Sequence, residues 1–127
     1  MKRLIALLVG VAAAGLLVAV AGSRHASAQD PAVVNASSIQ VKFENNRVRV
    51  LEATIKPGQK EELHSHPAYV TYVIAGGKVR NHPANGEATE TELKTGAAVF
   101  REPLTHWAEN IGTTTIRLVL VELKNPG

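Results

Sequence analysis

Two histidines separated by a single residue are the first feature of this sequence that points to chemistry. His64 and His66 flank Ser65. In an extended strand, side chains two residues apart lie on the same face, with Cα atoms roughly 6.6 Å apart at a rise of about 3.3 Å per residue. Two imidazoles in this arrangement can bind one ion at roughly 2.0–2.1 Å each. The same pair is also compatible with two hydrogen-bonded histidines on a strand edge, so the surrounding sequence has to distinguish the two interpretations.

The elements that would position these histidines are predicted to be short β-strands. Six runs with β-branched, aromatic or alternating residues are expected as strands: 47–55, 69–74, 78–81, 89–93, 97–101 and 114–123. Gly or Pro residues end these runs, and Asn85-Gly86 is typical of a hairpin turn. With short segments between these six runs, we expect seven or eight strands in total, which predicts a sandwich or a small barrel. Residues 30–38 are rich in Pro, Ala, Asn and Ser and are expected to form a linker or loose arm.

The sequence resembles the two motifs of the cupin superfamily. The first motif is a glycine, five residues, His-x-His, three or four residues, a glutamate, six residues and a glycine. Its positions are matched by Gly58, His64, His66 and Gly77. The second motif is a glycine, five residues, Pro-x-Gly, two residues, a histidine, three residues and an asparagine. Its positions are matched by Gly96, His106 and Asn110.

The resemblance extends from about Arg47 to Glu122. It implies an all-β fold, a double-stranded β-helix or jelly-roll barrel of the RmlC-like type. We expect this barrel over residues 47–123, preceded by an N-terminal arm over residues 29–46 and by a leader over residues 1–28.

Two departures from the motifs affect what the resemblance implies. Val70 stands at the glutamate position of the first motif, or Thr71 under the longer spacing. The proline of the second motif comes one place late, at Pro103, and its partner glycine is absent. The second departure is a local loop variation. The first removes the carboxylate ligand of metal-binding cupins.

Carried over residue by residue, the family's metal ligands become His64, His66 and His106, with nothing at the fourth position. Three neutral imidazoles with free coordination positions suit Fe, Zn, Ni, Cu, Co or Mn, between which the sequence does not distinguish. Without the carboxylate the ion keeps its full double charge, which favours an anionic ligand. The alternative is a degenerate site, in which the same histidines only form hydrogen bonds inside a cavity.

Other polar and aromatic residues are assigned from strand parity. Tyr72 shares its parity with Val70, so if Val70 occupies the ligand position Tyr72 faces the interior, and we expect it to bind substrate through its hydroxyl or to pack in the core. Trp107 adjoins His106 and is expected on the opposite face. Three further residues are expected at the surface or on that opposite face: Glu61, His82 and Glu109. Four arginines are equivalent candidates to meet a substrate carboxylate: Arg49, Arg80, Arg101 and Arg117.

The first 28 residues have the organisation of a secretory signal peptide. Lys2-Arg3 precedes an apolar run over residues 4–22, and Ala26-Ser27-Ala28 provides the small residues of a cleavage site. The apolar run is long for such a segment, so an uncleaved membrane anchor is the alternative. Cleavage after Ala28 predicts a periplasmic or secreted protein without stable membrane association.

Charge and cysteine content exclude several classes of protein. The 127-residue chain fits one domain, and its lack of cysteine excludes disulfides, thiolate metal sites and a cysteine nucleophile. The net charge of +3 belongs to the leader, because removing Lys2, Arg3 and Arg24 lowers the basic residues from 14 to 11, equal to the acidic ones. With no basic run left, we expect no nucleic-acid partner.

Two classes of function remain for such a protein. The first is a metal-dependent enzyme that acts on a small, anionic molecule, either an oxidoreductase of the dioxygenase type or an isomerase. No general base stands out, and no catalytic residue is assigned. The second is a protein that binds a small ligand or a metal without turnover. A domain of this size has little burial to spare, so dimerisation would add useful burial, and the resemblance to cupins implies a homodimer formed through the outer faces of the barrel.

Overall fold

The computed structural model describes residues 29–125. The predicted leader, its cleavage site and the competing membrane anchor fall on residues 1–28, outside the described residues. Within residues 29–125, no helix has the length and apolar character needed to cross a membrane.

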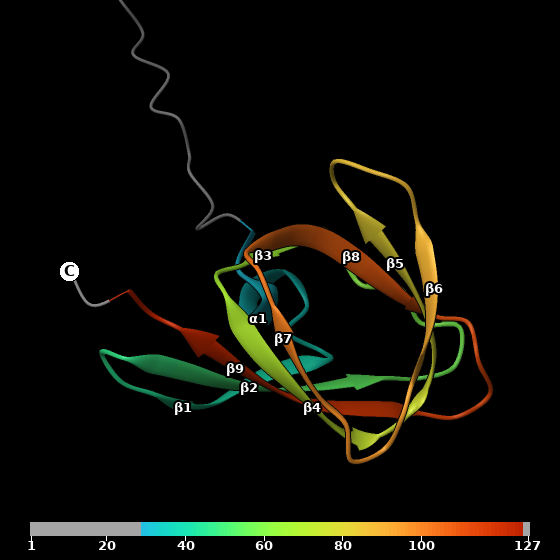
Figure 1. Ribbon diagram of the computed structural model, residues 1–127, viewed down its shortest axis with the longest axis horizontal. Helices are drawn as coiled ribbons and strands as arrows, with labels where there is room; N and C mark the ends of the chain where they lie inside the picture. The colour runs from blue at the N-terminus through green and yellow to red at the C-terminus, as the bar shows by residue number, and fades with distance from the viewer. Residues whose placement is uncertain (1–28, 126–127) are drawn as a thin grey trace, which may run out of the picture.

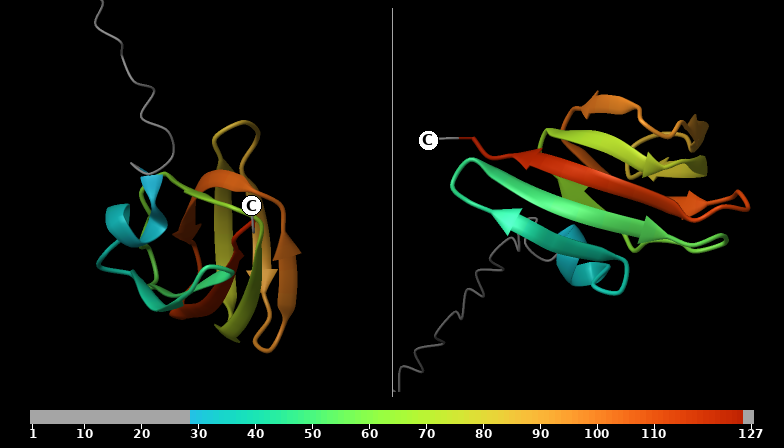
Figure 2. Two further views of the ribbon diagram at one scale, coloured as in Figure 1. Left: turned by 90° about the vertical axis from the view of Figure 1, so that its left-hand side faces the viewer. Right: turned by 90° about the horizontal axis from the view of Figure 1, so that it is seen from below.

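One short helix and nine antiparallel strands make up the regular structure of residues 29–125. Their bounds are α1 (Pro31–Val34), β1 (Ile39–Glu44), β2 (Val48–Ile55), β3 (His64–His66), β4 (Tyr69–Ala75), β5 (Gly77–Pro83), β6 (Thr89–Leu93), β7 (Ala98–Arg101), β8 (Leu104–Asn110) and β9 (Ile116–Leu123). A five-stranded sheet has the order β1-β2-β9-β4-β7, and a four-stranded sheet has the order β3-β8-β5-β6. The two sheets face each other around a common interior, with α1 beside β3 at one side (Figures 1 and 2). The predicted all-β barrel is therefore confirmed.

Alternating side chains of the two sheets fill the interior. β2 and β9 pair over their full length, from Val48 opposite Leu123 to Ile55 opposite Ile116. Inward-facing residues form two buried clusters, Ile39, Leu51, Ala53, Tyr69 and Leu120 in one and Ile55, Val79, Ala108 and Ile116 in the other. Because the period of a strand is two, the intervening residues of β2 and β9 lie on the outer face of the sheet.

The glycine that opens each motif occupies the same kind of turn. Gly58 has φ +78° and Gly96 has φ +85°. Each is the third residue of a four-residue turn closed by a backbone hydrogen bond, Gln59 N to Lys56 O at 2.9 Å and Ala97 N to Lys94 O at 3.0 Å. A positive φ at this position is typical of a type II turn and favours glycine.

Asn110, the last residue of the second motif, is buried at the end of β8. Its Nδ2 donates to the carbonyl oxygens of Ile55 and Thr114, both at 2.8 Å, and its Oδ1 accepts from Gly112 N at 3.0 Å. The side chain thus joins the end of β2 to the turn that leads into β9, so its role is structural.

The prediction of a linker or loose arm over residues 30–38 is wrong, because α1 forms there. Within residues 29–46, α1 and β1 form, and β1 pairs with β2 from Ile39 opposite Ala53 to Glu44 opposite Arg49. Asp30 caps α1 by accepting from Ala32 N at 2.9 Å, and Pro31 occupies the first turn, where its missing N–H has no cost. The composition of this segment therefore reflects helix capping.

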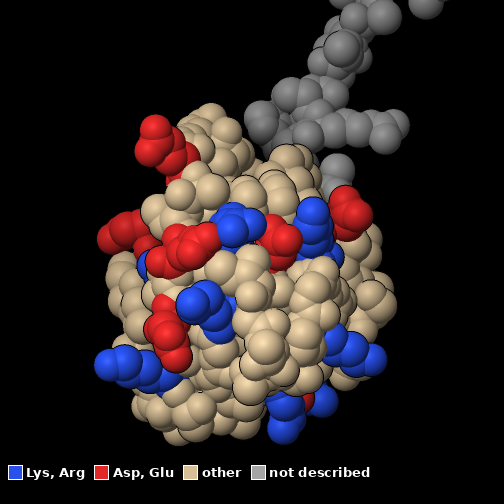
Figure 3. Space-filling view, turned by 90° about the vertical axis from the view of Figure 1, so that its right-hand side faces the viewer, with Lys and Arg blue, Asp and Glu red and all other residues tan. Residues whose placement is uncertain are grey.

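Charged side chains of both signs are mixed on the face of the molecule that Figure 3 shows. Acidic and basic groups lie next to each other there, without an extended patch of one sign. Ion pairs at the surface include that of Arg80 with Glu90, at 2.6 Å. This arrangement agrees with the equal numbers of acidic and basic residues that follow position 28.

Candidate metal centre

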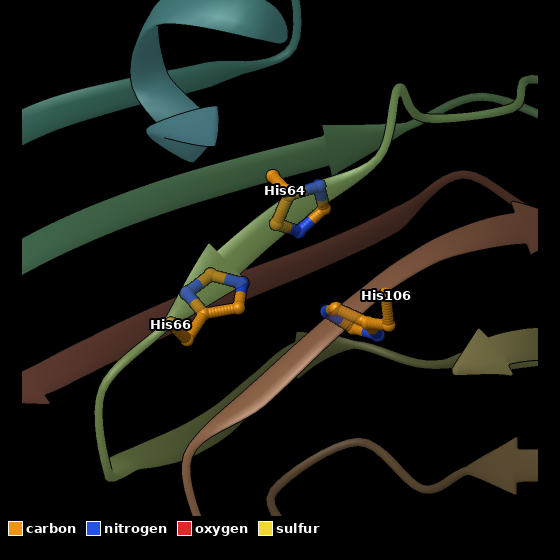
Figure 4. Close-up of side chains that lie close together, drawn as sticks. All are labelled: His64, His66 and His106. Carbon is orange, nitrogen blue, oxygen red and sulfur yellow. The ribbon is translucent and has the colours of Figure 1, made fainter. Parts of the chain in front are cut away.

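The pairing of β3 with β8 brings the three predicted ligands together. His64 lies directly opposite His106, and His66 lies two residues further along the same face of β3. One nitrogen of each ring lies within 4.8 Å of one nitrogen of each of the others. The ring centroids are 4.8 to 5.4 Å apart. Figure 4 shows the three rings grouped between the two strands. They are close enough to hold a metal ion, as the sequence predicted.

Each of the three rings is anchored through its Nδ1 atom. His64 Nδ1 donates to the carbonyl oxygen of Glu62 at 2.7 Å, and His66 Nδ1 donates to Glu122 Oε1 at 3.1 Å. His106 Nδ1 donates to Asn81 Oδ1. Each of these three bonds is to an oxygen acceptor, which places the proton on Nδ1 and the lone pair on Nε2; Asn35 Nδ2 also lies 3.1 Å from His64 Nδ1. Metal-binding histidines are commonly oriented in this way, by a hydrogen bond from the nitrogen that does not bind the ion.

An unsatisfied buried nitrogen tests whether these residues fit a metal. Nε2 of His106 is buried and has no hydrogen-bond partner. A buried lone pair without a donor is costly, and a cation would satisfy it. The donor set, three imidazole nitrogens and no thiolate, suits a divalent transition metal. The residues present therefore fit a metal ion.

Burial keeps two of the rings neutral. It lowers the pKa of His64 to about 4, although the hydrogen bond to Glu62 acts in the opposite direction. It lowers the pKa of His106 to about 3, with a further contribution from the neighbouring imidazoles. Both rings are neutral near pH 7, which is the protonation state that a metal ligand requires.

A buried ion pair supports the third ring. Glu122 accepts from His66 and also lies 3.2 Å from the guanidinium of Arg49. Burial alone would raise the pKa of Glu122, but the hydrogen bonds from His66 and Arg49 outweigh this effect and lower it. An ionised carboxylate therefore orients His66 from behind the ring.

The histidines line a cavity of about 90 Å³ between the sheets. Most of its other lining is apolar, from residues that include Ile55, Leu93, Leu118 and Leu120. Drug-sized ligand sites run to roughly 300–1,000 Å³, so this cavity suits a molecule of only a few heavy atoms.

Comparisons with known proteins were made for the sequence and for the fold. No family model matches the sequence, and no curated protein matches it. Among solved structures, the fold is similar to a cupin domain protein from Bordetella pertussis Tohama I (27% identity, 68% of this chain and 92% of that chain, TM-score 0.63). It is also similar to an uncharacterized protein with a double-stranded β-helix domain from Klebsiella pneumoniae (30% identity, 69% and 77%, TM-score 0.53). The chain belongs to the cupin superfamily. A further RmlC-like cupin, from Methanocaldococcus jannaschii, shares the fold at 12% identity (68% and 78%, TM-score 0.57).

The prediction that Tyr72 faces the interior is wrong. Tyr72 is 47% exposed on the outer face of β4, whereas Tyr69 and Thr71 are buried and line the cavity of this cupin. The structure therefore places Thr71, and not Val70, on the inner face where the family's glutamate would stand. The prediction counted parity from the shorter spacing, and a shift of one residue moves every side chain of a strand to the other face.

A second error concerns Glu61, which was expected in solvent. Its side chain is buried, with 9% exposure, and it is the one carboxylate among the described residues that line the cavity. Glu61 Oε1 accepts from Ala108 N at 3.2 Å, and the Glu61 backbone N donates to Ala108 O at 2.9 Å. Burial raises the pKa of Glu61 to about 7, although the bond from Ala108 acts against this. No sequence pattern marks this residue, because its burial depends on pairing with β8.

The structure also distinguishes between the four arginines. Arg101 lines the cavity, and in residues 29–125 no carboxylate lies within ion-pairing distance of it. The other three each form an ion pair: Arg49 with Asp30, Arg80 with Glu90 and Arg117 with Glu52. Arg101 is thus the arginine placed to meet an anion in the cavity.

The remaining predicted residues lie on the other face of the small sheet. Trp107 faces away from the cavity, as expected, and its ring stacks on that of His82 with centroids 3.6 Å apart. Glu109 lies 3.6 Å from Arg80 and 3.5 Å from His82 Nε2. These residues form an outer cluster, His82, Trp107, Glu109 and Arg80, that takes no part in the cavity.

Proposed function

We propose that this protein is an exported cupin that binds one divalent transition-metal ion and acts on a small anionic molecule. The observation that carries the proposal is the arrangement of His64, His66 and His106. Each Nδ1 atom donates to an oxygen acceptor, and the Nε2 lone pairs are left for a metal. A bound ion would supply a Lewis acid that polarises an oxygen of the ligand, or a centre for oxygen chemistry.

Arg101 supports the anionic class of ligand. Arg101 is an exposed residue at the end of β7 that contributes to the lining of the cavity, and it forms no ion pair in the described part of the chain. Guanidinium groups bind carboxylates through two parallel hydrogen bonds. A carboxylate of a few heavy atoms fits both the charge of Arg101 and the small volume of the cavity.

Glu61 supplies a group that can hold a proton next to the ligand. Its Oε1 accepts from Ala108 N, so the proton of the acid form lies on Oε2. With its pKa raised to about 7 by burial, the carboxyl group exists in both protonation states near neutral pH. This is the condition under which a side chain can exchange protons with a ligand in both directions. Proton transfer of this kind supports an isomerase or an oxidoreductase.

The metal and activity proposals are tested together on protein purified from cells that express the full chain. We expect near-stoichiometric metal by elemental analysis, and its identity separates two functions. Iron with oxygen uptake in the presence of small carboxylates supports an enzyme. Tightly held Zn or Cu without turnover supports the alternative, a binding protein, which the largely apolar lining of the cavity also suits. Protein that remains metal-free after incubation with Fe, Zn, Ni, Cu, Co and Mn would contradict both metal-dependent functions and would support the degenerate site, in which the protein binds a small ligand without a metal.

Export rests on the leader alone, and we propose that it delivers the protein to the periplasm or outside the cell. Mass spectrometry of the native protein tests this, because cleavage after Ala28 leaves Gln29 as the first residue. An N-terminus at Met1 in the membrane fraction would instead support an uncleaved anchor.

We also propose a homodimer through the outer face of the five-stranded sheet. The strand registers align one apolar row across it, Phe43, Val50, Val121, Val70 and Phe100. Phe43 and Phe100, at its two ends, are each 54% exposed. A two-fold contact would place this row against itself. Sedimentation should show a dimer for the wild type and a monomer for Phe100→Glu, and a monomeric wild type would refute the proposal.

A further inference from the structure

The segment from Gln29 to Asn35, named here the N-terminal clamp, packs against the strand that carries two of the three histidines. Its helix α1 contacts both β1 and β3, and Pro31 is fully buried. Ser65, which lies between the two histidines, donates through its hydroxyl to Gln29 Oε1 at 3.2 Å. The clamp lies outside both cupin motifs, yet its polar side chains lead to the metal centre along two separate paths.

The first path runs from Asn35 to His64. The buried amide of Asn35 binds both backbone groups of Glu62: Oδ1 accepts from Glu62 N at 2.7 Å, and Nδ2 donates to Glu62 O at 3.2 Å. The same Glu62 carbonyl oxygen accepts from His64 Nδ1 at 2.7 Å, and Asn35 Nδ2 lies 3.1 Å from that nitrogen. Asn35 therefore fixes the peptide group that orients His64.

The second path runs from Asp30 to His66. Asp30, the cap of α1, accepts from Arg49 Nη1 at 2.5 Å. Arg49 donates to Glu122 through Nε and Nη2, both at 3.3 Å. Glu122 in turn accepts from His66 Nδ1 at 3.1 Å. Both carboxylates and the guanidinium are largely removed from solvent, so the attraction between them is only weakly screened.

The third histidine is independent of the clamp. His106 is held by Asn81, which lies on β5 in the middle of the small sheet. The centre thus contains two rings that depend on the clamp and one that does not. His106 therefore serves as an internal reference for changes that affect His64 and His66.

We propose that the N-terminal clamp sets the metal affinity of the centre, with Asn35 and Asp30 as positioning residues for His64 and His66. The inference rests on the proposed metal-binding function. It assigns to residues 29–35 a role beyond packing, because the bonds of the clamp fix the groups that hold Nδ1 of His64 and His66 and so decide which nitrogen of these two rings faces the cavity. Metal binding needs Nε2 of both rings to be presented at once, so loosening either ring weakens the site.

The test compares three variants by Zn(II) affinity, measured on folded protein expressed from the full chain. Asn35→Ala removes the first path, and we expect about 10–100-fold weaker binding, the usual cost of losing a group that orients a ligand. Asp30→Asn keeps a good helix cap but removes the charge facing Arg49, so we expect a smaller loss of about 3-fold. Asn45→Ala is the matched control. This variant also loses hydrogen bonds between a side chain and the backbone, because Asn45 Oδ1 accepts from Arg47 N and Val48 N, both at 2.8 Å. The turn that contains Asn45 is remote from the metal centre, so the variant should keep the wild-type affinity.

A second readout needs no metal. Long-range ¹H–¹⁵N spectra of the metal-free protein report the tautomer of each ring, and the wild type should show Nδ1–H for all three histidines. In Asn35→Ala we expect the signals of His64 to change and those of His106 to stay. If the wild type binds no metal, the proposed function fails, and these spectra still decide whether the clamp orients the rings. If Asn35→Ala does not fold, Asp30→Asn decides through His66. Wild-type spectra together with wild-type affinity in the folded variants would overturn the proposal.

Discussion

The two faces of the small sheet carry histidines in opposite situations. On the inner face, His106 has a buried Nε2 without a partner, next to two other imidazoles and no acid within bonding distance of that atom. On the outer face, His82 also has an unbonded Nε2, but Glu109 lies 3.5 Å away and Trp107 stacks on the ring. Pairing of β5 with β8 places these residues almost side by side along the sheet. Histidine content therefore does not define a metal centre. The candidate site is instead identified by the face of the strand on which the histidines lie and by the groups that bind their Nδ1 atoms.

The largest expected effect tests the two faces by removing one histidine from each. His106→Ala should weaken metal binding by about 1,000-fold, since loss of a ligand costs more than the roughly 10–100-fold of an orienting group. His82→Ala should bind metal like the wild type. Titration with Zn(II) or Co(II) measures both. Equal losses in the two variants would mean that the inner face is not the site.

A pH experiment compares the carboxyl groups of the two faces. The pKa of Glu61 is raised from 4.5 to about 7, so its contribution to stability is fully present below pH 4.5 and is lost as the pH rises through 7. Glu61→Gln should remove this slope, which amounts to a relative gain on the order of 3 kcal/mol at pH 8. Urea unfolding of metal-free protein at pH 4.5 and pH 8 measures it. The cavity neighbours Tyr69, Arg101 and the histidines are the same in both proteins.

The matched control for that experiment is Glu109→Gln on the outer face, where Arg80 and Lys60 surround the carboxylate. This variant should keep the pH slope of the wild type. If the slope disappears in Glu109→Gln and persists in Glu61→Gln, the buried acid has been assigned to the wrong residue.

A smaller effect is expected from the arginines of the two faces. Arg101→Gln should weaken the binding of a small carboxylate such as oxalate about 10-fold, the cost of one charge-assisted hydrogen-bond pair. Arg80→Gln, whose wild-type side chain already binds Glu90, should have no effect. Calorimetry with the metal-loaded protein gives both affinities, and equal affinity in Arg101→Gln and wild type would exclude Arg101 from the ligand site.

The smallest effect concerns the stack itself. Trp107→Leu should lower the free energy of unfolding by about 1 kcal/mol, the usual worth of a stacked aromatic pair, and leave metal affinity unchanged. Chemical denaturation and metal titration of the same preparation check both statements. A loss of metal binding in this variant would show that the two faces are coupled.

The sequence was sufficient to predict the barrel and the three converging histidines, because the spacing of the motifs is carried by turns. The turn before each of the two motif strands requires a residue with positive φ, and Gly58 and Gly96 occupy these positions. The orientation of Thr71 could not be predicted, because nothing in the run of β-branched residues distinguishes one face of β4 from the other. Only the folded structure shows that Tyr69 and Thr71 are buried and face the second sheet.

Glu61 and Asn35 could not be predicted for a different reason. Each is polar and lies in a polar stretch, which alone favours an exposed position. Glu61 is buried because its backbone pairs with Ala108, 47 residues away, and Asn35 because it binds Glu62, 27 residues away. Long-range hydrogen bonds of this kind leave no periodic pattern in the sequence.

The anchoring of each imidazole through Nδ1 has a consequence for how metal enters and leaves. The rings are held by carbonyl, amide and carboxylate groups of the protein, and neither hydrophobic cluster contains one of the three histidines. We therefore expect the apo protein to be a ready-made receptor. A chelator should remove the metal reversibly, with no change in the circular dichroism of the protein. The rate of reloading should depend on how fast the metal reaches the cavity.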